Sequence, residues 1–229
     1  VLAFSLYENA GWDAHSNKLN FYQGSDAILV YGVRCTNVRG YATYQKASRI
    51  YFAFCDLPCD PMAKNRALVA QNFPPGSRFD GPDGTGEPVM NSTFYYWNNN
   101  LTASGRDTAA ANALMLGPKN TNQTHAFFNN ILHGGGFPSV YTHETPDARE
   151  IRSHNRYTGL SFWQKSRYGW ALRPHEAMMP VGGKPRGEGR DMRPVIAELA
   201  PLFPSFTDWD LDVDGNTVDW TRPPIGAQV

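Results

Sequence analysis

Four of the six histidines lie between residues 125 and 154, and one of them is followed directly by a glutamate. An imidazole next to a carboxylate can transfer protons near neutral pH, so His143 and Glu144 form a candidate acid–base pair. His133 and His125 are the further candidate proton carriers, and three glycines after His133 allow a ligand to approach the backbone closely. The alternative for each single histidine is a hydrogen-bonded structural role. No His-Glu-x-x-His motif is present, so a zinc protease of that kind is not indicated.

A second candidate region is basic and aromatic. Arginine binds carboxylate or phosphate groups, and aromatic rings stack on sugars or bases. Residues 152–174 interleave both kinds of side chain, and the predicted ligand-binding residues are Arg156, Trp163, Arg167, Tyr168 and Trp170. The predicted ligand is anionic or sugar-like, and a nucleic acid stays open as an anionic partner. The alternative is a pair of strands with buried aromatic and solvated basic side chains.

A third candidate is the stretch DWDLDVDGNTVDW, residues 208–220, which contains five aspartates. Asp210, Asp212 and Asp214 have the spacing of the first three ligands of a calcium loop, and Asp219 is the nearest further carboxylate. The twelfth position is Thr221 rather than a glutamate, so the pattern does not favour a regulatory EF-hand. Calcium is therefore the predicted cofactor, as a structural ion, and no nucleotide cofactor is indicated. An acidic turn without metal is the alternative, because Asp, Asn and Gly favour turns.

The three cysteines all lie in the first quarter of the chain, at Cys35, Cys55 and Cys59. An odd number allows one internal disulfide and leaves one thiol over. The predicted pairings are Cys55 with Cys59, or Cys35 with one of these two. A zinc site is less favoured because no second pair of ligands completes it.

Composition favours a secreted protein. Charged residues make up only 18% of the chain and aromatic residues 13%. Asn91, Asn100 and Asn122 each begin an Asn-x-Ser/Thr sequon, which predicts a glycoprotein. The chain begins at Val1, so we expect a processed product whose signal peptide has been removed. No apolar run is long enough to span a bilayer. The predicted location is extracellular, or a virion if the protein is an assembly subunit.

The elements that would position these residues are strands and short helices. Apolar, β-branched runs predict strands at residues 27–35, 50–55 and 92–97, with two more within 160–172. Capping residues and apolar stripes predict five helices. These lie at residues 61–71, 107–116, 121–133, 145–152 and 192–199.

The predicted fold is therefore α+β: a mixed or antiparallel sheet with several short helices and long Pro/Gly-rich loops at 73–91 and 177–190. We expect one domain over residues 1–229, with an acidic, proline-flanked C-terminal segment at about 201–229. No internal repeat is apparent.

Charge is uneven along a chain that is neutral overall. Residues 149–193 carry 10 basic and 4 acidic side chains, and residues 194–229 carry 1 basic and 6 acidic ones. Either the acidic end packs against the basic segment, or the basic segment faces an anionic ligand.

The first functional hypothesis is a secreted hydrolase or lyase that acts on a carbohydrate or nucleotide-like substrate by His/Glu acid–base chemistry. Two alternatives stay open. One is a structural or assembly protein, such as a virion coat or surface-filament subunit, with homo-oligomers possible. The other is a carbohydrate-binding module without catalysis.

Overall fold

The structure is a computed structural model. It describes residues 1–7, 19–21, 27–36, 43–45, 49–59, 68–70, 93–103, 114–116, 124–134, 140–142, 149–158, 172–180, 183–185 and 187–228.

Three sheets contain the described strands, and neighbouring strands within each sheet run parallel. Sheet A is formed by β1 (Leu2–Ala3), β4 (Ile28–Tyr31), β7 (Arg49–Ala53), β10 (Thr93–Trp97), β13 (Thr124–Phe128) and β16 (Arg149–Ser153). Sheet B is formed by β2 (Leu6–Tyr7), β5 (Arg34–Cys35), β8 (Asp56–Cys59), β11 (Asn100–Ala103), β14 (Ile131–Gly134), β17 (Arg156–Thr158) and β18 (Ala177–Met178). Sheet C is formed by β3 (Leu19–Phe21), β6 (Thr43–Gln45), β9 (Leu68–Ala70), β12 (Leu114–Leu116) and β15 (Val140–Thr142).

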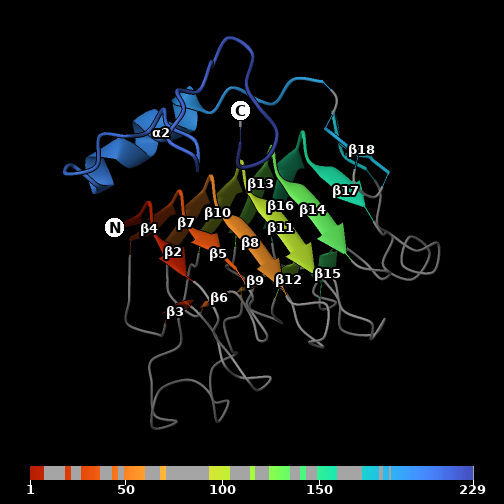
Figure 1. Ribbon diagram of the computed structural model, residues 1–229, viewed down its shortest axis with the longest axis horizontal. Coiled ribbons are helices and arrows are strands. Elements are labelled where there is room, and N and C mark those ends of the chain that lie inside the picture. The colour runs from red at the N-terminus through yellow and green to blue at the C-terminus, as the bar shows by residue number, and fades with distance from the viewer. Residues whose placement is uncertain are drawn as a thin grey trace, which may run out of the picture.

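The chain visits the sheets in the order A, B, C and then returns to A one strand further along. Each circuit is one coil, and successive coils stack through parallel strand pairing (Figure 1). This arrangement is a parallel β-solenoid, in which each coil buries its apolar side chains against its neighbours.

The turn from sheet A to sheet B is the same in every coil. Its first residue has a left-handed backbone, with φ between 45° and 63°. We call these residues the outer corner row: Phe4, Gly32, Phe54, Asn98, Asn129, His154 and His175. The residues that directly follow them form the inner corner row: Ser5, Val33, Cys55, Asn99, Asn130, Asn155 and Glu176.

Sheet A is buried on both faces, because alternate residues of a strand point in opposite directions. One face packs inside the solenoid, where Phe52, Tyr96 and Phe127 lie in one cluster with Leu57, Leu101 and Leu132 of sheet B. Tyr96 and Phe127 stack with their ring centroids 4.9 Å apart.

Residues 187–228 cover the other face of sheet A, and from here on we call this longer stretch the C-terminal segment (Figure 1). It contains α2 (Arg193–Leu199) and the short 3₁₀ helix η1 (Ala200–Leu202). Val195, Leu199, Phe203 and Trp220 of this segment pack on the outward face of the sheet. Burial of each such side chain contributes about 1.5–3 kcal/mol, so apolar contacts hold the segment in place.

The fold prediction was wrong. The described strands form parallel sheets rather than a mixed or antiparallel one, and α2 is the one α-helix in the described residues. The predicted helix at 121–133 is instead the two strands β13 and β14, with Asn129 and Asn130 at the corner between them. Phe127 and Phe128 point to opposite faces of sheet A and therefore do not form a helical stripe.

Two further predicted helices are also strands where the structure describes them. β12 occupies residues 114–116 of the predicted helix at 107–116, and β16 begins at Arg149 within the one at 145–152. The helix predicted at 192–199 does form, as α2, and Asp191 accepts a hydrogen bond from the backbone N–H of Arg193. Residues 68–70 of the helix predicted at 61–71 are likewise a strand, β9, and the rest of that prediction lies outside the described residues.

Candidate functional site

A ladder of buried asparagines joins the later coils along the inner corner row. The Oδ1 atom of Asn99 accepts from the backbone N–H of Cys55, and that of Asn130 accepts from the N–H of Asn99 at 3.0 Å. Asn155 accepts in the same way from Asn130 at 3.0 Å. Each side-chain amide also donates to the coil before it, as Asn130 does to the carbonyl of Tyr96 at 2.9 Å. The repeated pairing satisfies buried polar groups that would otherwise be costly.

Cys55 ends this ladder on the N-terminal side. Its thiol donates to the carbonyl oxygens of Val30 and Ala53, and the bond to Val30 repeats the geometry of the asparagine amides. Burial raises the pKa of the Cys55 thiol strongly, so the group stays protonated.

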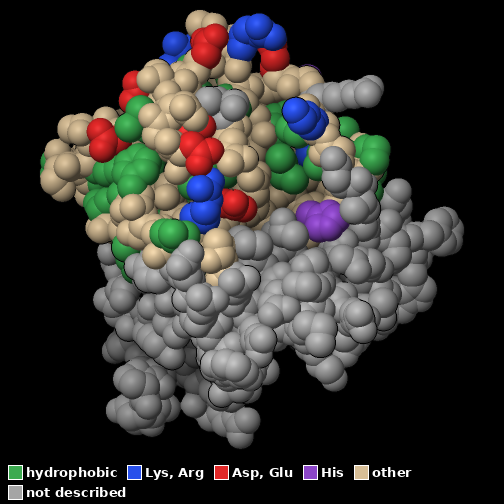
Figure 2. Space-filling model, in the orientation of Figure 1, with side chains coloured by type: hydrophobic (Ala, Val, Ile, Leu, Met, Phe, Trp, Pro, Cys, Tyr) green, Lys and Arg blue, Asp and Glu red, His purple; other side chains and the backbone are tan. Residues whose placement is uncertain are grey.

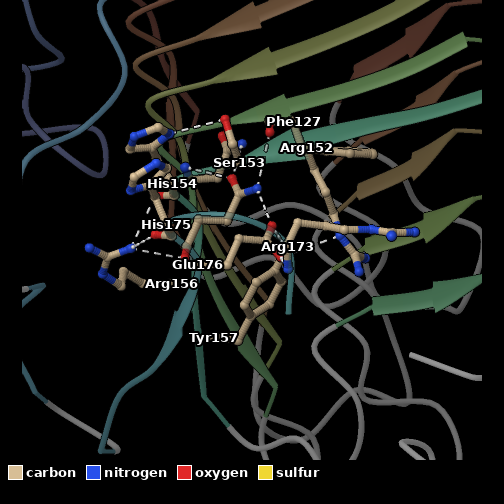
Figure 3. Close-up of polar contacts among 11 residues, drawn as sticks. Phe127, Arg152, Ser153, His154, Arg156, Tyr157, Arg173, His175 and Glu176 are labelled. Carbon is tan, nitrogen blue, oxygen red and sulfur yellow. Dashed lines mark hydrogen bonds and ion pairs between the residues drawn. The ribbon is translucent and has the colours of Figure 1, made fainter. Parts of the chain in front are cut away.

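Glu176 ends the ladder on the C-terminal side (Figure 3). Its Oε1 atom accepts from the Asn155 amide at 2.8 Å and from the Tyr157 hydroxyl at 2.7 Å. Its Oε2 atom accepts from the backbone N–H of Arg173 at 2.8 Å and lies 3.4 Å from Nε of Arg152. Four partners surround a fully buried carboxylate, so Glu176 closes the ladder and is not available for catalysis.

The last two residues of the outer corner row form a stacked pair. The His154 and His175 rings lie 4.4 Å apart with an angle of 12° between their planes (Figure 3). The Ser153 hydroxyl is hydrogen-bonded to Nδ1 of His154 at 3.0 Å, and Arg156 donates to the His175 carbonyl at 2.7 Å. The contacts fix both corners, while the His175 side chain is exposed.

Cations surround this histidine pair. Burial and the nearby charges of His175, Arg156 and Arg190 lower the pKa of His154, and Glu176 opposes them. Arg190 is fixed from the C-terminal segment, since its backbone N–H donates to Asn129 at 2.6 Å and its guanidinium lies 4.3 Å over the Phe128 ring. The pair therefore sits where positive potential favours an anion.

An open pocket of about 400 Å³ lies beside this corner, where Pro185, Gly187 and Glu188 face residues between 219 and 228. Three prolines and Ile225 supply its apolar lining, and the polar lining residues are Glu188, Asp219, Arg222 and Gln228. The pocket adjoins the corner at Gly187, because a Cβ atom there would lie 3.0 Å from Nη2 of Arg156. Glu188 pairs with Arg222 at 3.7 Å, and hydrogen bonds from Thr221 hold the pKa of Asp219 below its usual value.

A separate charged group lies on the outer face of sheet B. Arg34 contacts Asp56 at 3.6 Å and Asp214 of the C-terminal segment at 2.8 Å. Figure 2 shows acidic and basic side chains next to each other on this face. Burial raises the pKa of Asp56, the Asp214 charge adds to this effect and Arg34 opposes it. The group ties the C-terminal segment to sheet B.

The predicted catalytic residues do not form one described cluster. His125 lies on β13 of sheet A, and His133 lies on β14 of sheet B. Nδ1 of His133 contacts the Thr158 hydroxyl, and burial lowers the pKa of His133. His143 and Glu144 lie outside the described residues, so their pairing stays a prediction.

Of the predicted ligand-binding residues, Arg156 is described and the four at 163–170 are not. Arg156 is buried and donates to backbone carbonyls of the last corners, so it supports the histidine pair. Among the sequons, Asn91 and Asn122 lie outside the described residues. Asn100 is on β11, and its Oδ1 atom accepts from the backbone N–H of Ala227.

The predicted disulfide was wrong. Cys35 and Cys55 are both free and buried, and each predicted pairing used one of them. Both thiols face the apolar interior of the solenoid, where they pack as small apolar side chains.

The metal-binding prediction was also wrong for the part of the chain that the structure describes. No group of three or more His, Cys, Asp or Glu side chains there could hold a metal ion. Asp212 is buried; its Oδ1 atom accepts from the backbone N–H groups of Asp214 and Asn216, and its Oδ2 atom accepts from the Asn216 side-chain amide. Asp214 instead pairs with Arg34, and Asp219 accepts from Thr221. Residues 210–219 therefore form an acidic turn that its own hydrogen bonds close.

Among the described residues, the acidic end meets the basic segment through the charge of Asp219, which acts on Arg193. Its long-range ion pair goes to Arg34, near the start of the chain, and its main contacts with the solenoid are apolar.

Sequence reasoning missed the pocket, the ladder and Glu176. The available signal was the recurrence of Asn at positions 99, 130 and 155, of which the first two follow an apolar, aromatic run after one further Asn.

No protein-family model, curated protein or solved structure matches this chain. The fold and the site thus define the class of the molecule: a parallel β-solenoid with a covering C-terminal segment and a polar pocket beside its last corners. None of the helices in the described ranges is both long enough and apolar enough to cross a membrane.

Proposed function

We propose that this protein binds a carbohydrate in the pocket that Pro185, Gly187 and Glu188 form with residues between 219 and 228. The observation that carries the proposal is the lining of that pocket: an apolar surface of prolines and Ile225 next to Glu188, Asp219, Arg222 and Gln228. A sugar ring presents apolar C–H faces and hydroxyls that both donate and accept. Carboxylates accept, Arg donates and Gln does both, so the lining complements a sugar.

The dimensions and the fold are consistent with this ligand. About 400 Å³ falls within the usual size range of small-molecule sites. Stacked coils present long surfaces on which an extended polymer can lie, as in other repeat architectures.

The test is binding of the whole chain to a panel of neutral and acidic oligosaccharides, measured by calorimetry. Glu188→Ala removes a polar lining group that is 64% exposed, so we expect unchanged stability and at least about tenfold weaker binding. Glu198→Ala is the matched control, because Glu198 is exposed on α2 and is not a pocket residue. The proposal fails if no oligosaccharide binds, or if both variants bind as the wild type does.

Hydrolysis of the bound sugar is the second candidate function. Glu188 and Asp219 both line the pocket, and most glycosidases use two carboxylates. One of the two must act as the acid and the other must stay ionised, and the hydrogen bonds from Thr221 suit Asp219 to the ionised role. Glu188 would then be the acid, but its side chain is exposed and pairs with Arg222, whereas a catalytic acid is held in a water-poor site. We therefore rank binding ahead of turnover. If the wild type releases reducing ends from a bound oligosaccharide and Asp219→Asn does not, hydrolysis becomes the favoured function. His143 and Glu144 are the alternative catalytic pair.

A further inference from the structure

The outer corner row changes its role along the solenoid. In the middle coils its side chains hold the C-terminal segment. Phe54 packs edge-on against Trp220, Asn98 donates to the carbonyl of Pro224 at 2.8 Å, and Asn129 donates to the carbonyl of Arg190 at 2.8 Å. These corners therefore act as a binding row for an acceptor-rich chain, which here is the protein's own backbone.

The next two members of the row are His154 and His175. Their backbone geometry is the same as that of the asparagines, and His175 is exposed while His154 is partly exposed. The stacked rings thus continue the binding row beyond the part that the C-terminal segment occupies (Figure 3).

The charges around the pair select the ligand. Three parts of the fold place polar or charged groups around His154. Its own corner and the adjoining strand contribute Ser153 and Arg156, the next coil contributes His175 and Glu176, and the C-terminal segment contributes Arg190. Glu176 is buried and surrounded by four partners, so its charge is directed into the fold. Exposed Arg190 and the two imidazoles face the same corner, and a negatively charged group is the complement.

We infer that His154, His175 and Arg190 form a subsite for the acidic group of an anionic sugar, and that binding of this group takes up protons at the histidine pair. The inference rests on the proposed carbohydrate-binding function and names the substrate class as an acidic oligosaccharide. A carboxylate or a sulfate would satisfy the same donors.

The direction of the pH effect follows from linkage. In the free protein burial, and after it the neighbouring cations, disfavour the charged imidazole, which lowers the pKa of His154. A bound anion favours the charged form and raises that pKa. The complex therefore holds more protons than the free protein, and affinity increases as the pH falls through the histidine range.

The experiment compares an oligogalacturonate, its neutral methyl ester and a sulfated oligosaccharide at about pH 5.5 and about pH 8, by calorimetry. Wild-type protein should bind the acidic oligosaccharides at least about tenfold more tightly at the lower pH, with proton uptake seen as a dependence of the heat on the buffer. The methyl ester should bind equally at both values. His175→Asn keeps the left-handed corner and removes one ring of the stacked pair, so the pH dependence of binding should become weaker. Glu188→Ala should weaken all three ligands and retain the pH dependence.

The possible results separate the two proposals. Binding of all three oligosaccharides without a pH effect, or with the same effect in His175→Asn, overturns the subsite and leaves the carbohydrate pocket. If none of them binds at either pH, both proposals fall. A preference for the sulfated over the carboxylated oligosaccharide at low pH supports the subsite and identifies the acidic group.

Discussion

The inner and outer corner rows are one residue apart in the chain and have opposite roles. Asn99, Asn130 and Asn155 point into the solenoid, where their side chains are buried and bonded to the neighbouring coils. Asn98, Asn129 and His154 occupy the preceding, left-handed position and point toward the C-terminal segment or away from the core. The inner row bonds the coils to one another. Asn98 and Asn129 of the outer row are also buried, but they bond mainly to the C-terminal segment, and the histidines at the end of that row are partly or fully exposed.

The difference shows that position rather than residue type decides the role of a polar side chain. Asparagine occurs in both rows. In the inner row it is a structural element, and in the outer row it binds another segment. Substitutions in the two rows should therefore have different consequences, and each of the following experiments tests that separation.

The largest effect is expected for Asn130→Ala, in the middle of the ladder. The substitution leaves the Asn99 backbone N–H and the Tyr96 carbonyl without their partners inside the solenoid. Each unsatisfied buried group costs about 1–3 kcal/mol, so the free energy of unfolding should fall by about 3–5 kcal/mol. Urea denaturation followed by circular dichroism measures it. His154→Asn, which keeps the left-handed corner at a partly exposed position of the outer row, should cost less than half as much near pH 8, and equal losses would contradict the distinction between the rows.

The burial of sheet A explains which parts of the fold the sequence could predict. Strands do form within 27–35, 50–55 and 92–97, because sheet A is buried on both faces and gives nearly continuous apolar runs. The run at 27–35 was predicted as one strand, although a corner at Gly32 divides it into β4 and β5. A left-handed corner filled by Phe4 or Phe54 has no signature in residue type.

The repeat itself could not be predicted for a related reason. The ladder asparagines are 31 residues apart between 99 and 130 and 25 apart between 130 and 155. Repeat detection needs a fixed period, and variable connections between the strands remove it. The pocket could not be predicted from the sequence either. Gly187, Arg156 and Asp219 become neighbours only after the coils have stacked and the C-terminal segment has folded back.

A smaller loss is expected for Glu176→Gln, at the end of the inner row. Glutamine would place an amide donor against either the Asn155 and Tyr157 donors or the Arg173 N–H. It would also remove the negative charge near Arg152. We expect a loss of about 2–3 kcal/mol, because a buried charge-assisted network is broken while the shape is retained. Glu188→Gln is the exposed control and should change stability by less than about 0.5 kcal/mol; similar values for the two would show that the Glu176 network contributes little.

The smallest change is expected for His175→Asn in the outer row. Asparagine adopts the left-handed backbone at least as readily as histidine, so stability near pH 8 should change by no more than about 0.5 kcal/mol.

The pH dependence of stability is the sharper measurement for His175→Asn. Because the pKa of His154 is lowered in the folded protein, the unfolded chain binds more protons and the wild type loses stability as the pH falls through the histidine range. Removing the His175 charge lets the pKa of His154 rise toward its ordinary value, so the loss should be smaller in the variant. Melting temperatures at about pH 5.5 and about pH 8 would reveal this. An identical pH dependence in both proteins would mean that the stacked His175 ring does not change the pKa of His154. The end of the outer row would then have no titration behaviour that distinguishes it from the inner row.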